Sequence, residues 1–95
     1  MSTPAIPMGL FPLGNIVATA SAMYALSHEE MVSGLRRHQS GDWGDLQKDD
    51  QAENASALLK GRRILSLYTS ATGTQFWIIT EADRSATTVL LPEDY

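Results

Sequence analysis

The stretch GRRILSLYTS, residues 61–70, marks the point where the hydrophobic pattern of the chain changes. Before Gly61, apolar residues recur at the spacing of three and four positions that is typical of helices. After Gly61 the pattern has a period of two, with Ile64, Ser66 and Tyr68 on one side of an extended run. The sequence therefore predicts helices before residue 61 and strands after it.

Three β-prone runs follow this switch. They are RRILSLYTS (62–70), QFWIIT (75–80) and ATTVLL (86–91), and the connections ATGT and EADRS are short enough for hairpins. The middle run is apolar on both faces and is expected at the centre of an antiparallel meander. A further short β-prone run, NIVAT, lies upstream at 15–19.

Capping residues predict where two helices start. Thr19 or Ser21 can cap a short helix that ends at Leu26. Ser27 and Glu30 have the spacing of a capping box, which predicts a second helix to about residue 38.

A third helical pattern covers residues 45–60, and the second capping signature DQAE (50–53) allows a break near Asp49 and Asp50. Gly41 is expected to end the preceding helix with a left-handed residue, and Asp42 to cap the next helix just before Trp43. The expected inward face of this third helix consists of Ala55, Leu58 and Leu59.

These elements predict an α+β fold, in which N-terminal helices pack on a three- to four-stranded antiparallel β-meander. Residues 15–95 are expected to form a single domain. Residues 1–14 contain three prolines and two glycines, and we expect them to form an extended, partly mobile arm.

Composition excludes several functional classes. The 95-residue chain has no cysteine, which removes disulfides and thiolate chemistry, and its two histidines are too few and too far apart for a metal site. No phosphate-binding loop is present, so no cofactor is expected. No run approaches the about 18 apolar residues of a membrane span, and a cytoplasmic protein without membrane contact is expected. Because a chain of this size has a small core, a homodimer remains an alternative to the monomer.

The formal net charge of −4 favours a protein partner over nucleic acid. Acids concentrate in residues 42–53, and two arginines precede them. Large aromatic side chains are common anchors of protein interfaces. The residues expected to contact a host protein or protein complex are Arg36, Arg37, Asp42, Trp43, Asp45, Asp49, Asp50, Glu53, Tyr68 and Trp77. The structural alternative is a solvated acidic helix face and aromatics that belong to the core.

A metal-independent ribonuclease is the first alternative function, and a transcriptional accessory factor is a third candidate, although the sequence shows no helix-turn-helix with a basic recognition helix. Cleavage of RNA by its own 2′-hydroxyl needs a base, an acid and cations on the phosphate, and His38, Arg63, Glu81 and Arg84 have the required chemistry. Each of them also has a structural interpretation. His38 stands at a helix end, and in the EADRS turn Asp83 can close the loop while Arg84 pairs with Glu81.

Three stretches carry a resemblance to a known family: RHQSGDWG (37–44), NASALLKGRRILSLY (54–68) and WIITEADRSATTVLLPEDY (77–95). They resemble small proteins carried on bacterial plasmids, integrative elements and prophages, and FPLGNIVATASAM (11–23) extends the resemblance. Such elements carry inhibitors of host defence, so the resemblance implies a stoichiometric binding protein of the anti-CRISPR or anti-restriction kind.

The order of helices followed by a β-meander is also similar to that of barnase-like and RelE-like ribonuclease toxins. That similarity would place His38 and Arg63 in an active cleft. The chain differs from those toxins in its negative net charge. This difference disfavours RNA binding, because phosphate contacts need cations.

Overall fold

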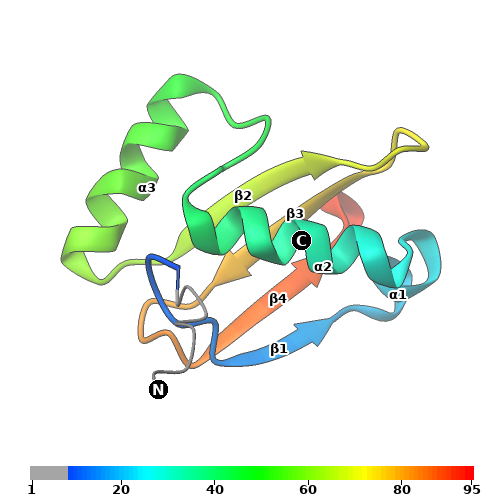
Figure 1. Ribbon diagram of the computed structural model, residues 1–95, viewed down its shortest axis with the longest axis horizontal. Coiled ribbons are helices and arrows are strands. Elements are labelled where there is room, and N and C mark those ends of the chain that lie inside the picture. Colours follow the sequence, from blue (N-terminus) through cyan, green and yellow to red (C-terminus); the bar gives the residue numbers. More distant parts are fainter. Residues whose placement is uncertain (1–8) are drawn as a thin grey trace, which may run out of the picture.

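The computed structural model describes residues 9–95, in which a short strand precedes three helices and three further strands follow (Figure 1). The elements are β1 (Asn15–Ala18), α1 (Ala20–Ala25), α2 (His28–Ser40), α3 (Lys48–Lys60), β2 (Ile64–Thr69), β3 (Gln75–Thr80), β4 (Ala86–Leu90) and the 3₁₀ turn η1 (Pro92–Asp94). The change from helix to strand at Gly61 is confirmed. The first eight residues of the predicted arm lie outside the described residues.

The sheet has the strand order β1-β4-β3-β2. The predicted meander is confirmed, since β2, β3 and β4 pair antiparallel in sequence. The prediction of a wholly antiparallel sheet is wrong, because β1 runs parallel to β4, with Val17 opposite Thr88. Parallel neighbours need a long connection, and here the three helices and the strands β2 and β3 separate β1 from β4 in the sequence. The NIVAT pattern predicts an extended segment but carries no information on its direction.

The predicted caps of the first two helices are confirmed. The Thr19 side chain accepts a hydrogen bond from the backbone of Ala22 at the start of α1. Ser27 and Glu30 form the reciprocal capping box of α2. Gly41 ends α2 in the left-handed conformation, with φ of 90°.

The third helix begins later than predicted, at Lys48, and Asp42 does not cap it. Residues 43–45 instead run beside the outer edge of β2. The Leu67 N–H donates to the Trp43 carbonyl at 3.2 Å, and the Asp45 N–H donates to the Leu67 carbonyl at 2.7 Å. Between them, Gly44 has φ of 72° and lies so close to β2 that a Cβ would collide with the Leu67 carbonyl oxygen. These tertiary hydrogen bonds override the helical pattern of the segment.

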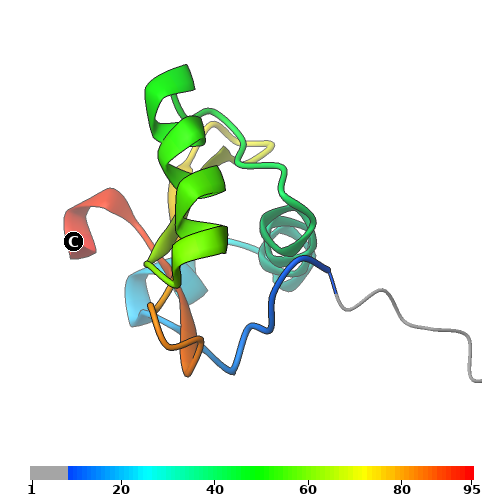
Figure 2. The ribbon, with the colours of Figure 1, turned by 90° about the vertical axis from the view of Figure 1, so that its left-hand side faces the viewer.

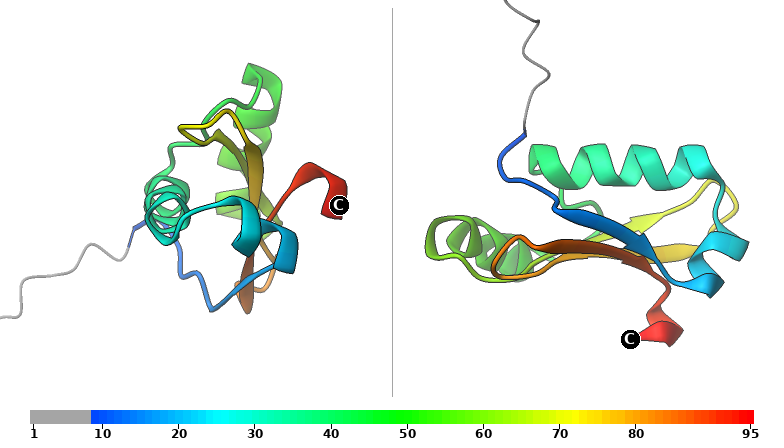
Figure 3. Two further views of the ribbon diagram at one scale, coloured as in Figure 1. Left: turned by 90° about the vertical axis from the view of Figure 1, so that its right-hand side faces the viewer. Right: turned by 90° about the horizontal axis from the view of Figure 1, so that it is seen from below.

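The predicted inward face of α3 is wrong at two of its three positions. Ala55 is exposed and Leu59 is 89% exposed, whereas Asn54 and Ala57 are buried. The reason is that α3 lies along the outer edge of β2 and not over a face of the sheet (Figures 1 and 3). The Asn54 side chain of α3 hydrogen-bonds to this edge. Its amide oxygen accepts from the Leu65 N–H, and its amide nitrogen donates to the Leu65 carbonyl.

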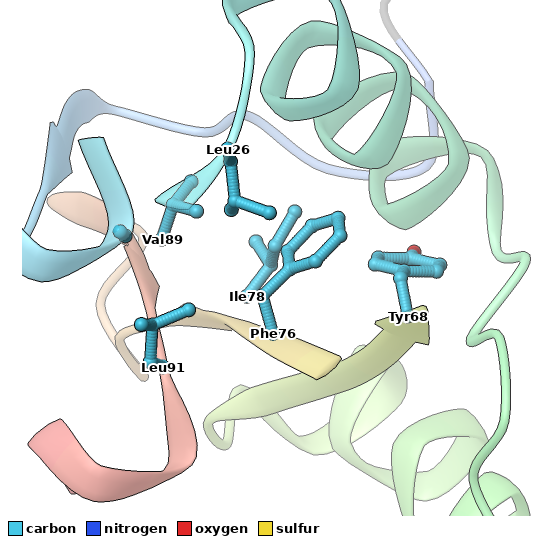
Figure 4. Packing of buried hydrophobic residues seen from close by; sticks show 7 residues of the cluster. Leu26, Tyr68, Phe76, Ile78, Val89 and Leu91 are labelled. Carbon is cyan, nitrogen blue, oxygen red and sulfur yellow. The ribbon is translucent and has the colours of Figure 1, made fainter. Parts of the chain in front are cut away.

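Helix α2 covers one face of the sheet, and η1 lies against the opposite face (Figure 2). The larger core cluster fills the space between the sheet and α1 and α2 (Figure 4) and consists of Ala22, Leu26, Tyr68, Phe76, Ile78, Val89 and Leu91. A second cluster lies near α3 and consists of Phe11, Trp43, Ala57 and Ile64. Phe11 belongs to the predicted arm, so at least this part of the arm contributes to the core.

Asn54 provides a test of how α3 is attached. The substitution Asn54→Ala should lower the free energy of unfolding by about 1–3 kcal/mol, because it leaves the Leu65 N–H and carbonyl without their partners. Urea denaturation followed by circular dichroism measures the change. Glu53→Ala, at an exposed position of the same helix, is the control and should stay close to the wild type. Equal stability of the two variants would contradict this role of Asn54.

Candidate binding surface

His38, a candidate acid of the ribonuclease hypothesis, has no exposed surface. Its Nδ1 lies 2.6 Å from the Ser66 hydroxyl and its Nε2 lies 2.9 Å from the Thr80 hydroxyl. The Thr80 hydroxyl contacts that of Thr87 at 2.7 Å, and Thr87 donates to the Leu13 carbonyl at 2.7 Å. One chain of hydrogen bonds therefore links α2, three strand residues and the segment before β1.

The acceptor at the end of this chain fixes the direction of every proton in it. Because Thr87 donates to a carbonyl, it accepts from Thr80, and Thr80 accepts from His38. His38 is therefore the neutral tautomer with its proton on Nε2, and Nδ1 accepts from Ser66. Burial, together with the positive charge of Arg84, lowers the pKa of His38 to about 4. The imidazole thus acts as a neutral structural bridge.

None of the other three candidates of the ribonuclease hypothesis hydrogen-bonds to His38, although Arg84 lies close enough for its charge to act on the imidazole. The predicted pairing of Arg84 with the Glu81 carboxylate is wrong, because the guanidinium donates to backbone carbonyls instead. These acceptors are the carbonyls of Ala57, Arg62, Glu81 and Ala82. The Asp83 carboxylate closes the turn as predicted, accepting from the Ser85 N–H at 3.0 Å. Arg63 donates to the Tyr95 hydroxyl at 2.8 Å. Tyr95 stacks on Trp77, which lies on the face of the sheet away from α2. Arg63 and His38 are therefore on opposite sides of the sheet.

Two of the expected aromatic anchors belong to the core. Trp43 is 8% exposed and Tyr68 only 1% exposed. The Tyr68 hydroxyl donates to the Asp42 carbonyl at 2.6 Å, and burial raises the pKa of this phenol to about 12. Arg37 lies over the Tyr68 ring at 4.6 Å from its centroid and makes the ion pair with Asp42 at 2.7 Å. The structural interpretation therefore applies to these aromatics.

The expected acidic residues are exposed, but they do not share one role. Asp49, Asp50 and Glu53 are on the exposed side of the N-terminal half of α3. Asp45 instead accepts a hydrogen bond from the Thr69 hydroxyl at 2.8 Å. Arg36 is exposed on α2. The helix dipole stabilises acids at a helix start, which is sufficient to explain Asp49 and Asp50 in the first turn of α3.

A hollow of about 270 Å³ lies between α2 and the turn that joins β2 to β3. Its charged residues include Glu29, Glu30 and Arg37. Glu30 already accepts hydrogen bonds from the N–H groups of Ser27 and Ala71, and Arg37 is held by Asp42. Two of these three charged groups are therefore already bonded within the protein.

The third anchor, Trp77, is half-buried on the sheet face away from α2. Its ring stacks on that of Tyr95 with centroids 5.5 Å apart and an interplanar angle of 16°. Tyr95 is 69% exposed, and Arg63 donates to its hydroxyl group. We call Arg63, Trp77 and Tyr95 the aromatic ledge.

The position of Tyr95 depends on the preceding residue, Asp94. The Asp94 carboxylate accepts hydrogen bonds from the hydroxyls of Thr19 and Ser21, which fasten η1 to the start of α1. These hydrogen bonds lower the pKa of Asp94. Sequence reasoning missed Tyr95, although its neighbour Pro92 is a signal that the strand has ended.

Among residues 9–95, no three His, Asp or Glu side chains converge in a group that could hold a metal ion. Within the same range, no helix is long and apolar enough to cross a membrane. No family model matches the chain, and the comparisons with curated proteins and with solved structures give no match either.

The burial of His38 predicts how stability depends on pH. Between pH 6.5 and about 4 the unfolded chain binds a proton that the folded chain does not, so stability present above pH 6.5 is lost as the pH falls. Over this range the wild type should lose about 3 kcal/mol of unfolding free energy more than His38→Gln. Urea denaturation at several pH values measures this difference.

The exposed histidine provides the control for this experiment. His28→Gln is the matched variant, because residue 28 is exposed and lies outside the hydrogen-bond chain of His38. Parallel pH profiles for the wild type and His38→Gln would contradict the assignment of a buried, neutral imidazole.

Proposed function

We propose that this chain is a small protein-binding domain of a bacterial mobile element, and that it acts by occupying a surface on a host protein or protein complex. The observation that carries the proposal is the aromatic ledge. Trp, Tyr and Arg are the residue types that most often dominate binding energy at protein interfaces, and here all three occur in one contact group. The resemblance to proteins of plasmids and prophages supports inhibition of host defence as the setting.

Contacts within the chain itself hold the residues of the aromatic ledge in place. Trp77 projects from an inner strand, Tyr95 stacks on it, and the Asp94 hydrogen bonds hold η1 in place. A side chain that is already fixed loses little conformational entropy on binding, so more of the contact energy appears as affinity. The half-buried Leu65 and Leu67, on the same face as Trp77, extend the apolar surface.

Local charge indicates the chemistry of the partner surface. Lys60, Arg62 and Arg63 are exposed where α3 ends and β2 begins, so the ledge is flanked by bases in spite of the negative net charge of the chain. The Arg63 guanidinium uses one of its amino groups on Tyr95 and has other N–H donors available. The matching surface has an apolar side chain for the two rings and a carboxylate for Arg63.

The acids of α3 have a separate part in the proposal. Asp49, Asp50 and Glu53 lie at the opposite end of α3 from Lys60. A surface with separated acidic and basic regions orients an approaching partner, which affects the association rate more than the final affinity. Neutralising these acids is therefore expected to change the salt dependence of binding.

Substitution of the ledge tests the proposal. The tagged protein is used to capture its partner from a lysate of a host that carries the mobile element, and the captured protein is then titrated against purified variants. Trp77→Ala should weaken binding about 30-fold or more, as expected for an interface hot spot. Leu59→Ala removes a large exposed apolar side chain on α3 and should bind like the wild type.

A second variant separates binding from folding. Arg63→Ala removes an exposed guanidinium and should also weaken binding, while its circular dichroism spectrum and unfolding midpoint stay close to those of the wild type. Full binding by both Trp77→Ala and Arg63→Ala would refute the ledge as the contact surface. Cleavage of RNA in the presence of chelator, lost in His38→Ala and in Arg63→Ala, would favour the ribonuclease alternative.

A further inference from the structure

The two edges of the sheet differ in how their backbone groups are satisfied. On the β2 edge, the Asn54 amide pairs with Leu65, and residues 43–45 pair with Leu67. The β1 edge has no such cover among residues 9–95. Uncovered edges readily pair with another strand, and natural proteins usually protect them.

The backbone groups that β1 offers to a neighbour can be identified from its ladder with β4. The Asn15 N–H donates to the Ser85 carbonyl, and the Thr19 N–H donates to the Val89 carbonyl. Because alternate residues of a strand direct their polar groups to the same side, the N–H and carbonyl groups of Ile16 and Ala18 point away from the sheet. Two residues of β1 therefore offer two donors and two acceptors.

The side chains at this edge are apolar. Ile16 is 53% exposed and lies on the α2 side of the sheet, whereas Val17 is 49% exposed on the other side. A groove of about 260 Å³ lies between β1 and α2. Its lining residues are apolar apart from His28, and they include Ile16 and Ala18 of β1.

We propose that β1 pairs antiparallel with β1 of a second copy of this chain, around a two-fold axis at Val17. In this register Ile16 lies opposite Ala18 of the second copy, and Ala18 lies opposite the other Ile16. These two pairs exchange four hydrogen bonds through the outward backbone groups, and the two Val17 residues form the central pair without hydrogen bonds. The two sheets join into one sheet of eight strands.

Two features of the edge favour a second copy over another partner. Around a two-fold axis each strand meets an identical strand, so charged residues near the axis would lie close to their own copies and repel them. Residues 15–19, NIVAT, carry no charge. In this register the large Ile16 lies opposite the small Ala18 of the second copy. Each isoleucine side chain therefore has space beside that alanine, at the open side of the groove between β1 and α2.

Because the chain contains no cysteine, one introduced thiol can test the register directly. Two Val17 residues in a non-hydrogen-bonded antiparallel pair have Cα atoms about 4.5 Å apart, which is within the range of a disulfide. Val17→Cys should therefore form a covalent dimer under mild oxidation. Ile16→Cys is the matched control, since two residues 16 are offset along the strands by about 7 Å and should not form a disulfide.

The oligomeric state of the unmodified chain is the second measurement. Sedimentation equilibrium should show a concentration-dependent rise in mass from 10.4 kDa towards twice that value. Ile16→Lys places a charge beside the axis and should remain a monomer, whereas Leu59→Lys, on the exposed side of α3, should still dimerise. A wild-type chain that stays at 10.4 kDa at several hundred micromolar, or equal cross-linking of the two cysteine variants, would overturn the proposal. The test is independent of the aromatic ledge, because neither substitution touches it.

Discussion

The hydrogen-bond chain through His38 is the constraint on which the arrangement of the layers depends. It joins α2 to Ser66 on β2, Thr80 on β3 and Thr87 on β4, and it ends on the Leu13 carbonyl before β1. A polar chain inside an apolar core is costly unless every member is satisfied, and no buried side-chain nitrogen or oxygen of the described residues lacks a partner. The arrangement therefore favours one position of α2 on the sheet, because a shift of the helix would leave several buried hydroxyls without partners.

The two faces of the sheet are consequently used in different ways. The α2 face is closed by the helix and by the His38 chain, and it buries His38, which a catalytic interpretation would have needed at the surface. Among residues 9–95, η1 covers part of the opposite face (Figure 2), where Trp77 and Tyr95 stay partly accessible. This division supports a binding role on one face and a purely structural role on the other.

Local signals in the sequence were sufficient for much of the fold. Caps, the change of periodicity at Gly61 and the hairpin connections depend on residues that are close together in the chain. The errors all involve partners that are distant in sequence. The direction of β1 depends on β4, the start of α3 depends on the contact of residues 43–45 with β2, and the solvent exposure of Leu59 follows from the edge position of α3. Tyr95 was missed for the same reason, since its stacking on Trp77 joins residues that no spacing rule connects.

The parallel pairing of β1 with β4 has a consequence for the order in which the chain folds. The partners Asn15 and Ala86 are separated by most of the sequence, whereas each hairpin of the meander closes a short loop. Closing a long loop costs more conformational entropy, so the first strand to be synthesised is expected to join the sheet last. Until then, the nascent protein exposes a β4 edge onto which β1 can still dock.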